Sequence, residues 1–135
     1  MPSRSVQPDA TRPARYRQFI GQQAEDRALA YLQAQGMRLI QRNYRSIYGE
    51  IDLILQHRQT LVFAEVRYRR SNRFMLVAET VSNSKQRKII ATARYFLARH
   101  HFSCSAMRFD VITLVGRLDD TPEITWLPSA FDDAG

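Results

Sequence analysis

Apolar residues recur every three or four positions in the first third of the chain. The positions that follow this spacing are Ile20, Ala24, Ala28 and Leu32. A period of about 3.6 residues is typical of a helix with one buried face, and a glycine such as the one at position 36 commonly ends a helix. The pattern therefore predicts a helix of about four turns between Ile20 and Gly36.

A second helical period runs from Lys85 to about His100, with an apolar stripe that includes Ile89, Ala93 and Phe96. Short apolar runs bounded by turn residues predict strands elsewhere in the chain. These runs are residues 37–43, 50–57, 60–68, 107–115 and 123–127. Residues 71–84 are polar and predict an irregular loop before the second helix.

The expected order is helix, three strands, helix and then further strand. The first three strands have short connections and can pair as an antiparallel meander, after which the second helix can cross over to a fourth strand. The sequence thus predicts a mixed α/β sheet flanked by helices. It contains no glycine-rich loop of the kind that binds nucleotide cofactors, so a doubly wound cofactor-binding fold is not expected.

Length and composition fit one folded domain. The chain has 135 residues, of which 44% are hydrophobic and 24% charged, as is usual for globular proteins. We expect a flexible basic arm at residues 1–18, a single domain at 19–131 and a short acidic tail at 132–135. No apolar run reaches the roughly 18 residues of a membrane helix, and Cys104 alone excludes an internal disulfide. A cytoplasmic protein is therefore expected.

Positive charge is the main departure from average composition. The chain has 20 Lys and Arg against 13 Asp and Glu, a formal charge of +7, and residues 1–116 alone carry +11. Eighteen of the basic residues are arginine, whose planar guanidinium suits phosphate recognition. This excess favours a nucleic-acid partner. Solubility combined with arginine-rich codon usage explains it equally well, so both interpretations stay open.

Two neighbouring predicted strands carry the candidate chemistry. A two-residue loop at Arg58–Gln59 would join them as a hairpin and fix which residues face each other. The pairs expected on one side are Asp52–Glu65, Glu50–Arg67 and Ile54–Phe63. The other side is apolar and is predicted to be the core face. Its residues are Ile51, Leu53, Leu55, Val62, Ala64 and Val66.

Two carboxylates that face each other across a hairpin repel, because their Cβ atoms are about 4.5–5.5 Å apart. A cation between them removes the repulsion, and oxygen ligands suit Mg²⁺ or Mn²⁺. Such an ion can activate water and neutralise charge on a phosphate. The prediction depends on register, because Arg58–Gln59 lacks the Asn-Gly chemistry of a favoured tight turn. Solvated surface acids at positions 52 and 65 are the alternative.

Three short motifs and two single residues give the sequence a family resemblance. The motifs are GEIDLI at residues 49–54, FAEVR at 63–67 and RFDV at 108–111. The single residues are Glu25 on the first helix and Lys85 at the start of the second. In combination they resemble the YraN family of small bacterial proteins over residues 18–131. That family is similar to restriction-endonuclease-like nucleases, whose motif is Asp, a gap and Glu-x-Lys on adjacent strands, and to Holliday-junction resolvases.

The resemblance implies a role for each matching residue. Asp52 and Glu65 match the two acids that bind Mg²⁺ or Mn²⁺, and Glu25 matches the glutamate that resolvases add on the first helix. Arg67 stands where the motif has lysine. Arginine stays protonated and cannot act as a base, but it could hold the scissile phosphate or the attacking water, and Lys85 is the candidate replacement for the motif lysine. A plain surface acid at position 25 and an ion pair between Arg67 and Glu50 remain open.

Further basic residues lie close to the implied site in the sequence. Arg69, Arg70 and Arg73 follow the second acidic strand. Arg87 and Lys88 lie in the first turns of the second helix, where positive charge opposes the helix dipole. Phosphate contact explains both groups, and a solvated loop and a solvated helix end are the alternatives.

Three functions are compatible with the sequence. The first is a metal-dependent nuclease that hydrolyses phosphodiester bonds in DNA; the resolvase analogy suggests branched or damaged DNA and admits a homodimer. The second is a nucleic-acid-binding protein with the same fold and no turnover, which the arginine at position 67 favours. The third and weakest is an adaptor that docks through its acidic C-terminal region. Asp110 has apolar strand neighbours and is predicted to be structural.

Overall fold

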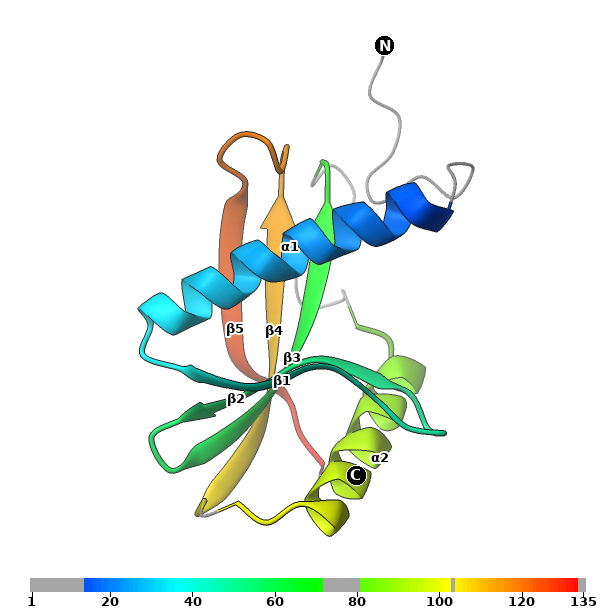
Figure 1. Cartoon of the computed structure of the whole chain (residues 1–135), viewed down its shortest axis with the longest axis vertical. Helices are drawn as coiled ribbons and strands as arrows, with labels where there is room; N and C mark the ends of the chain where they lie inside the picture. Colours follow the sequence, from blue (N-terminus) through cyan, green and yellow to red (C-terminus); the bar gives the residue numbers. More distant parts are fainter. Residues whose placement is uncertain (1–13, 72–80, 103, 134–135) are drawn as a thin grey trace.

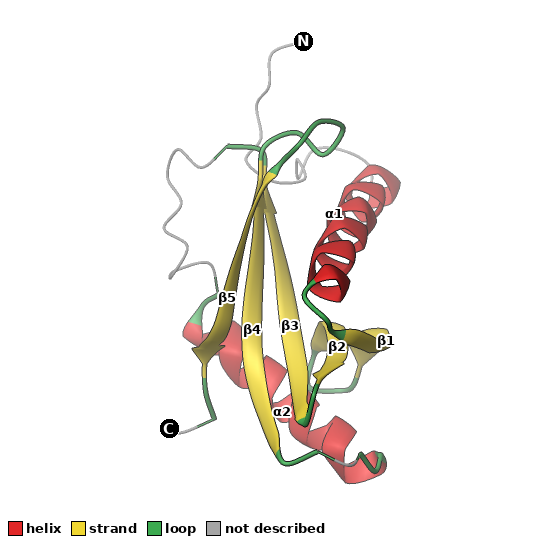
Figure 2. Cartoon of the chain, turned by 90° about the vertical axis from the view of Figure 1, so that its left-hand side faces the viewer, coloured by secondary structure: helices red, strands yellow, loops and turns green. Residues whose placement is uncertain are grey.

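One sheet with a helix on each face makes up the computed structural model (Figures 1 and 2), which describes residues 14–71, 81–102 and 104–133. The elements are α1 (Ala14–Ala34), β1 (Arg38–Arg45), β2 (Glu50–His57), β3 (Thr60–Arg69), α2 (Asn83–Arg99), β4 (Ala106–Val115) and β5 (Glu123–Phe131). Neither of these helices combines the length and the apolar composition needed to cross a membrane.

The strands follow the order β1-β2-β3-β4-β5 across the sheet. β1, β2 and β3 form the expected antiparallel meander, and β4 lies parallel to β3 because α2 carries the chain back across the sheet. β5 then pairs antiparallel with β4 and continues to Phe131, beyond its predicted end at residue 127. The predicted mixed α/β sheet flanked by helices is confirmed.

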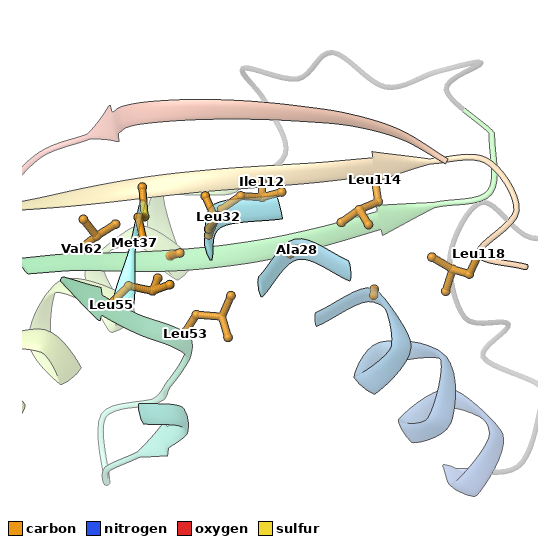
Figure 3. Close-up of a cluster of buried hydrophobic side chains, with 11 residues drawn as sticks. Ala28, Leu32, Met37, Leu53, Leu55, Val62, Ile112, Leu114 and Leu118 are labelled. Atoms are coloured by element: carbon orange, nitrogen blue, oxygen red, sulfur yellow. The ribbon is translucent and has the colours of Figure 1, made fainter. Parts of the chain in front are cut away.

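Each face of the sheet has its own apolar core. On the α1 side, buried residues of the helix meet buried residues of the strands (Figure 3). They include Ala28, Leu32, Leu53, Leu55, Val62 and Ile112. On the α2 side the cluster includes Ile54, Phe63, Ile89, Phe96 and Phe109. The prediction of a single core face for the β2–β3 hairpin is therefore wrong, because Ile54 and Phe63 are fully buried on the side that was expected to be charged.

The two ends of α1 differ in how well the sequence predicts them. The helix already begins at Ala14, so residues 14–18, expected in the flexible arm, are helical; residues 1–13 lie outside the described residues. The end agrees with the prediction. Gly36 has φ 95° and donates to the Gln33 carbonyl at 3.0 Å, while Met37 donates to the Leu32 carbonyl at 3.1 Å. These are the two hydrogen bonds of a Schellman motif.

Asp110 fastens β4 to β5, which confirms its predicted structural role. Its side chain is fully buried and accepts hydrogen bonds from Arg108 Nε at 3.0 Å, Trp126 Nε1 at 2.9 Å and Ser129 N at 3.0 Å. The register between the two strands shifts at this position. The carboxylate thus replaces the regular pairing that the shift interrupts.

Candidate active site

β2 and β3 separate at the point where the candidate acids lie. From His57 opposite Thr60 to Leu53 opposite Ala64, their residues pair in the predicted register. The regular pairs stop there, one residue before Asp52 and Glu65. The backbone N–H of Val66 donates instead to Oδ2 of Asp52 at 2.8 Å. A side chain therefore takes the place of a strand-to-strand hydrogen bond.

The alternation of faces along β2 also breaks at Asp52. Residues two apart normally share a face of the sheet, so Ile51 was expected beside Leu53. Leu53 lies in the cluster under α1, whereas Ile51 lies with Ile54 in the cluster under α2, and the prediction for Ile51 is wrong. Because of this break, the side chain of Asp52 can share a cleft with residues of α1.

That cleft has a volume of about 220 Å³ and lies between α1, the separating strands and the start of α2. It is lined by Gly21, Ala24, Glu25, Asp52, Glu65, Val66, Arg67, Tyr68, Arg69 and Lys85. The wall formed by α1 is open, because a Cβ placed on Gly21 would meet no atom within 4 Å. The structure thus brings together all of the residues predicted to be catalytic: Glu25, Asp52, Glu65, Arg67 and Lys85.

Glu65 is the most deeply buried acid of the cleft, with 4% of its surface exposed. Its Oε2 atom lies 3.1 Å from Lys85 Nζ and 3.7 Å from Arg67 Nη1. Lys85 is positioned by the start of α2, where Ser82 Oγ accepts a hydrogen bond from Lys85 N at 3.1 Å. Two cations from different elements therefore converge on one carboxylate.

Asp52 is held in an environment that disfavours its negative charge. Burial, and next the negative charge of neighbouring Glu65, raise the pKa of Asp52 well above its usual 3.8. The hydrogen bond from Val66 N acts in the opposite direction but is the smaller effect. The two carboxyl groups are adjacent enough to share a hydrogen bond. A proton or a cation is therefore needed to make this pair stable.

Glu25 lines the cleft but is directed towards β1. Its Oε1 atom accepts a hydrogen bond from Arg42 Nη2 at 3.2 Å, and Arg42 Nη1 also binds Asp26 at 2.8 Å. Burial raises the pKa of Glu25, and the Arg42 guanidinium limits the rise. Within the described part of the chain, no three His, Cys, Asp or Glu side chains are grouped closely enough to hold one ion.

The expected pair between Glu50 and Arg67 does not form. Glu50 Oε2 lies 3.1 Å from Arg45 Nε on β1, while Arg67 approaches Glu65. The pairing of β2 with β3 has ended before this position, so no strand register holds Glu50 and Arg67 opposite each other. Of the two interpretations of Arg67, the cross-strand ion pair is the one that the structure contradicts.

The predicted phosphate-binding residues do not all lie in the cleft. Arg69 lines it, and Arg70 follows directly after β3. Arg87 and Lys88 are exposed on α2 and are not part of the lining. Arg73 lies outside the described residues.

Three residues that support the site were not singled out from the sequence. Arg42 and Tyr68 carry no motif, and their positions depend on how α1 crosses the sheet. Ser82 has a detectable signal, since serine commonly precedes a helix. The predicted helix begins at Lys85, whereas α2 begins two residues earlier, at Asn83, directly after Ser82.

Comparison with known proteins places this cleft within a family. The model of the uncharacterised protein family UPF0102 matches residues 24–114. UPF0102 proteins of Herminiimonas arsenicoxydans and Nitrosomonas europaea are 45% and 43% identical to the chain, covering 90% and 84% of it and 93% and 94% of their own lengths. A relative in Ralstonia nicotianae is 48% identical over 82% of the chain and 85% of its own length. The chain belongs to the UPF0102 family. YraN is another name for this group, so the resemblance to that family is confirmed.

The UPF0102 match also shows which parts of the structure are shared. Residues 24–114 include every residue that lines the cleft except Gly21, and they end at the last residues of β4. β5 and the N-terminal half of α1 lie outside the match. The cleft is therefore built almost entirely from the part of the chain that the family model describes.

Proposed function

We propose that the cleft binds DNA and hydrolyses its phosphodiester bonds, using Mg²⁺ or Mn²⁺ held by Asp52 and Glu65. The observation that carries the proposal is the adjacent, largely buried acid pair with Lys85 and Arg67 beside it. A cleft that holds both carboxylates and cations can bind a metal ion and a phosphate side by side. The element order and the placement of the acids on β2 and β3 agree with the nuclease resemblance.

The acid pair fits a hard divalent ion. Two carboxylates supply oxygen ligands, and Mg²⁺ commonly binds one or two carboxylates while waters and substrate phosphate complete its shell. A site without a third acidic ligand is therefore adequate for such an ion. Bound there, it would lower the pKa of a water molecule and offset negative charge on the phosphate.

The remaining residues of the cleft have roles that follow from their charge. Arg67 is permanently cationic and can donate two parallel hydrogen bonds to a phosphate. Lys85 Nζ, 3.1 Å from Glu65, can donate to the same phosphate or hold a water molecule next to the acid pair. Asp52 can act as a ligand only in its ionised form, and its pKa is raised, so binding of an ion is coupled to pH.

A nucleic-acid-binding protein without turnover is the second candidate. It is favoured by the contacts of Glu65, whose charge is already balanced by Lys85 and Arg67, and by the arginine at the motif lysine position. The adaptor hypothesis has less support, since Asp119 pairs with Arg117 and Asp133 pairs with Arg94 within the chain. A homodimer stays a prediction.

The test begins with calorimetric titration of Mn²⁺ into the wild type, Asp52→Asn and Glu50→Gln. The Glu50 variant is a matched control, because its carboxylate is on the same strand and binds Arg45 outside the cleft. We expect the wild type and the control to bind Mn²⁺ with release of protons, seen as a dependence of the heat on buffer ionisation. Asp52→Asn should not bind.

Cleavage of labelled linear and branched DNA then separates the two candidates. Hydrolysis that needs Mg²⁺ or Mn²⁺ and disappears in both Asp52→Asn and Glu65→Gln, while DNA binding persists, supports the nuclease. DNA binding by the wild type without metal binding or cleavage would reject the nuclease and leave the non-catalytic binder. Absence of DNA binding would reject both.

A further inference from the structure

The turn between β1 and β2 presents an unusual apolar pair to solvent. Ile47 is 90% exposed and Tyr48 is 49% exposed; among the described residues, the other large hydrophobic side chain that is exposed is Phe19 on α1. An isolated exposed apolar residue is ordinary. Two in succession at the tip of a hairpin form a small projecting surface, here called the Ile47–Tyr48 turn.

This turn is held rigidly. Ser46 and Gly49 exchange backbone hydrogen bonds of 2.8 and 3.3 Å, and Ser46 Oγ accepts from Tyr48 N at 3.0 Å. The same Oγ lies 3.2 Å from Thr92 Oγ1 on α2. Figure 1 shows the connection between β1 and β2 beside this helix. The backbone next to the exposed Ile47 is therefore held by hydrogen bonds within the turn and to α2.

The Ile47–Tyr48 turn lies close to the cleft. A Cβ placed on Gly49 would come within 3.3 Å of Lys88 Cβ, so the backbone of the turn rests directly on α2 at Lys88. Lys88 is three residues after Lys85, which lines the cleft, and three residues of helix span about 4.5 Å.

Positive charge surrounds the same surface. Arg45 lies two residues before Ile47. Its side chain is 76% exposed, although its Nε atom lies 3.1 Å from Glu50 Oε2, and Arg87 and Lys88 are exposed on the adjoining helix. Tyr48 also meets the ring of Tyr95 edge-on at 6.1 Å. An apolar and an aromatic side chain flanked by cations suit a nucleic acid, whose flat bases lie between phosphates. They suit an apolar protein surface less well.

We propose that the Ile47–Tyr48 turn inserts at an interruption in base stacking and so directs the cleft to branched or forked DNA. This inference rests on the proposed function and names the part of the chain that would recognise the branched DNA suggested by the resemblance. Ile47 takes the place of a stacking neighbour, Tyr48 stacks on the exposed base, and Arg45, Arg87 and Lys88 bind the adjoining phosphates. Continuous duplex offers no opening for the turn and contacts the basic residues alone.

The experiment compares a forked duplex with a linear duplex of the same sequence, both in EDTA so that no hydrolysis occurs. Fluorescence anisotropy gives the Kd for each DNA, and 2-aminopurine at the branch point reports unstacking. The variants are Ile47→Ala combined with Tyr48→Ala, and Phe19→Ala as an exposed apolar control on α1. Thermal unfolding verifies that each variant is folded.

We expect wild type and Phe19→Ala to prefer the forked DNA by about tenfold and to brighten 2-aminopurine. The double variant should lose both effects and keep its affinity for linear duplex. Equal preference in the double variant and wild type would overturn the inference while leaving the proposed function intact. A change from dimer to monomer in the double variant, with unchanged fork preference, would identify the turn as a self-association surface instead. Failure of the wild type to bind either DNA would reject the proposed function itself.

Discussion

Asp52 is the residue whose surroundings conflict most with its charge. Burial and neighbouring Glu65 both raise the pKa of Asp52, while its hydrogen bond from Val66 N fixes the side chain in place. The group cannot swing out to water without leaving a backbone N–H without a partner. The conflict therefore has to appear in the stability of the protein.

Asp52→Asn should stabilise the metal-free protein at neutral pH. Because the pKa of Asp52 is raised in the folded state, this one residue costs no stability below its usual pKa of 3.8, and its cost grows as the pH rises from there through the raised value. Asparagine can still accept from Val66 N and does not ionise. We expect a gain on the order of 1 kcal/mol at pH 7.5, read as a rise of about 3–5 °C in Tm, that vanishes near pH 4.

The control for this measurement is Glu123→Gln, an exposed acid at the start of β5. Its Tm should match that of the wild type at both pH values. A gain for Asp52→Asn that is as large at pH 4 as at pH 7.5 would contradict the assignment of the effect to the charge of Asp52.

Asp110 shows the opposite situation, a buried acid whose partners are complete. Asp110→Ala leaves Arg108, Trp126 Nε1 and Ser129 N without their acceptor, and loss of one member of a buried charged pair costs about 3–5 kcal/mol. Urea unfolding followed by the fluorescence of Trp126, the single tryptophan, measures this loss. Asp119→Ala, which removes an exposed pair with Arg117, should leave the urea midpoint close to that of the wild type, because exposed ion pairs contribute little to stability.

At the scale of single residues, the sequence predicted the acidic residues of the cleft but not the side chains that contact them. Asp52 and Glu65 were singled out by the register expected from loop length and by the family motifs. The regular pairing itself ends one residue before them, at Leu53 and Ala64. The bond of Arg42 to Glu25 joins β1 to α1 and depends on the angle at which the helix crosses the sheet. Residue spacing contains no information on that angle.

Two glycines of the α1 region should respond to alanine with opposite signs. Gly36 has φ 95° in the motif that ends α1, where a Cβ costs about 1–2 kcal/mol. Gly21 lies inside α1 with no atom within 4 Å of an added Cβ, so alanine there should add about 0.5–1 kcal/mol of stability. Chemical denaturation of the two variants measures both effects, and a gain for Gly36→Ala would be incompatible with the Schellman geometry.

The helices and strands were predicted wherever burial of one face imposes a regular spacing of apolar residues along the sequence. The end of α1, its apolar stripe and the meander all follow from such periods. The first turn of α1 was missed because residues 14, 15, 17, 18 and 19 are exposed and no buried face constrains their sequence. The separation of β2 from β3 was missed for another reason. It depends on a carboxylate that replaces a backbone partner, and alternation rules assume regular pairing.

The charge of the whole molecule gives the proposed DNA binding a measurable salt dependence. Each phosphate contact made by a basic side chain contributes about −0.9 to the slope of log K against log salt. Arg87→Gln should therefore reduce the magnitude of the slope by about one and weaken binding to any duplex sequence. The control is Arg38→Gln. Arg38 is the first residue of β1, at the opposite end of the strand from the Ile47–Tyr48 turn, and is bonded to Gln56, so this variant should leave the slope unchanged. Equal slopes for the wild type, Arg87→Gln and Arg38→Gln would show that Arg87 does not contact a phosphate.

The two cores of the molecule do not depend on the acids. The regular pairing of β2 with β3 ends at Leu53 and Ala64, and the apolar clusters on both faces are complete without Asp52 or Glu65. A descendant of this chain that lost either acid would therefore still fold and would keep its basic surface. Natural selection could therefore discard the proposed chemistry and retain the scaffold, so that members with and without the acid pair share the same architecture.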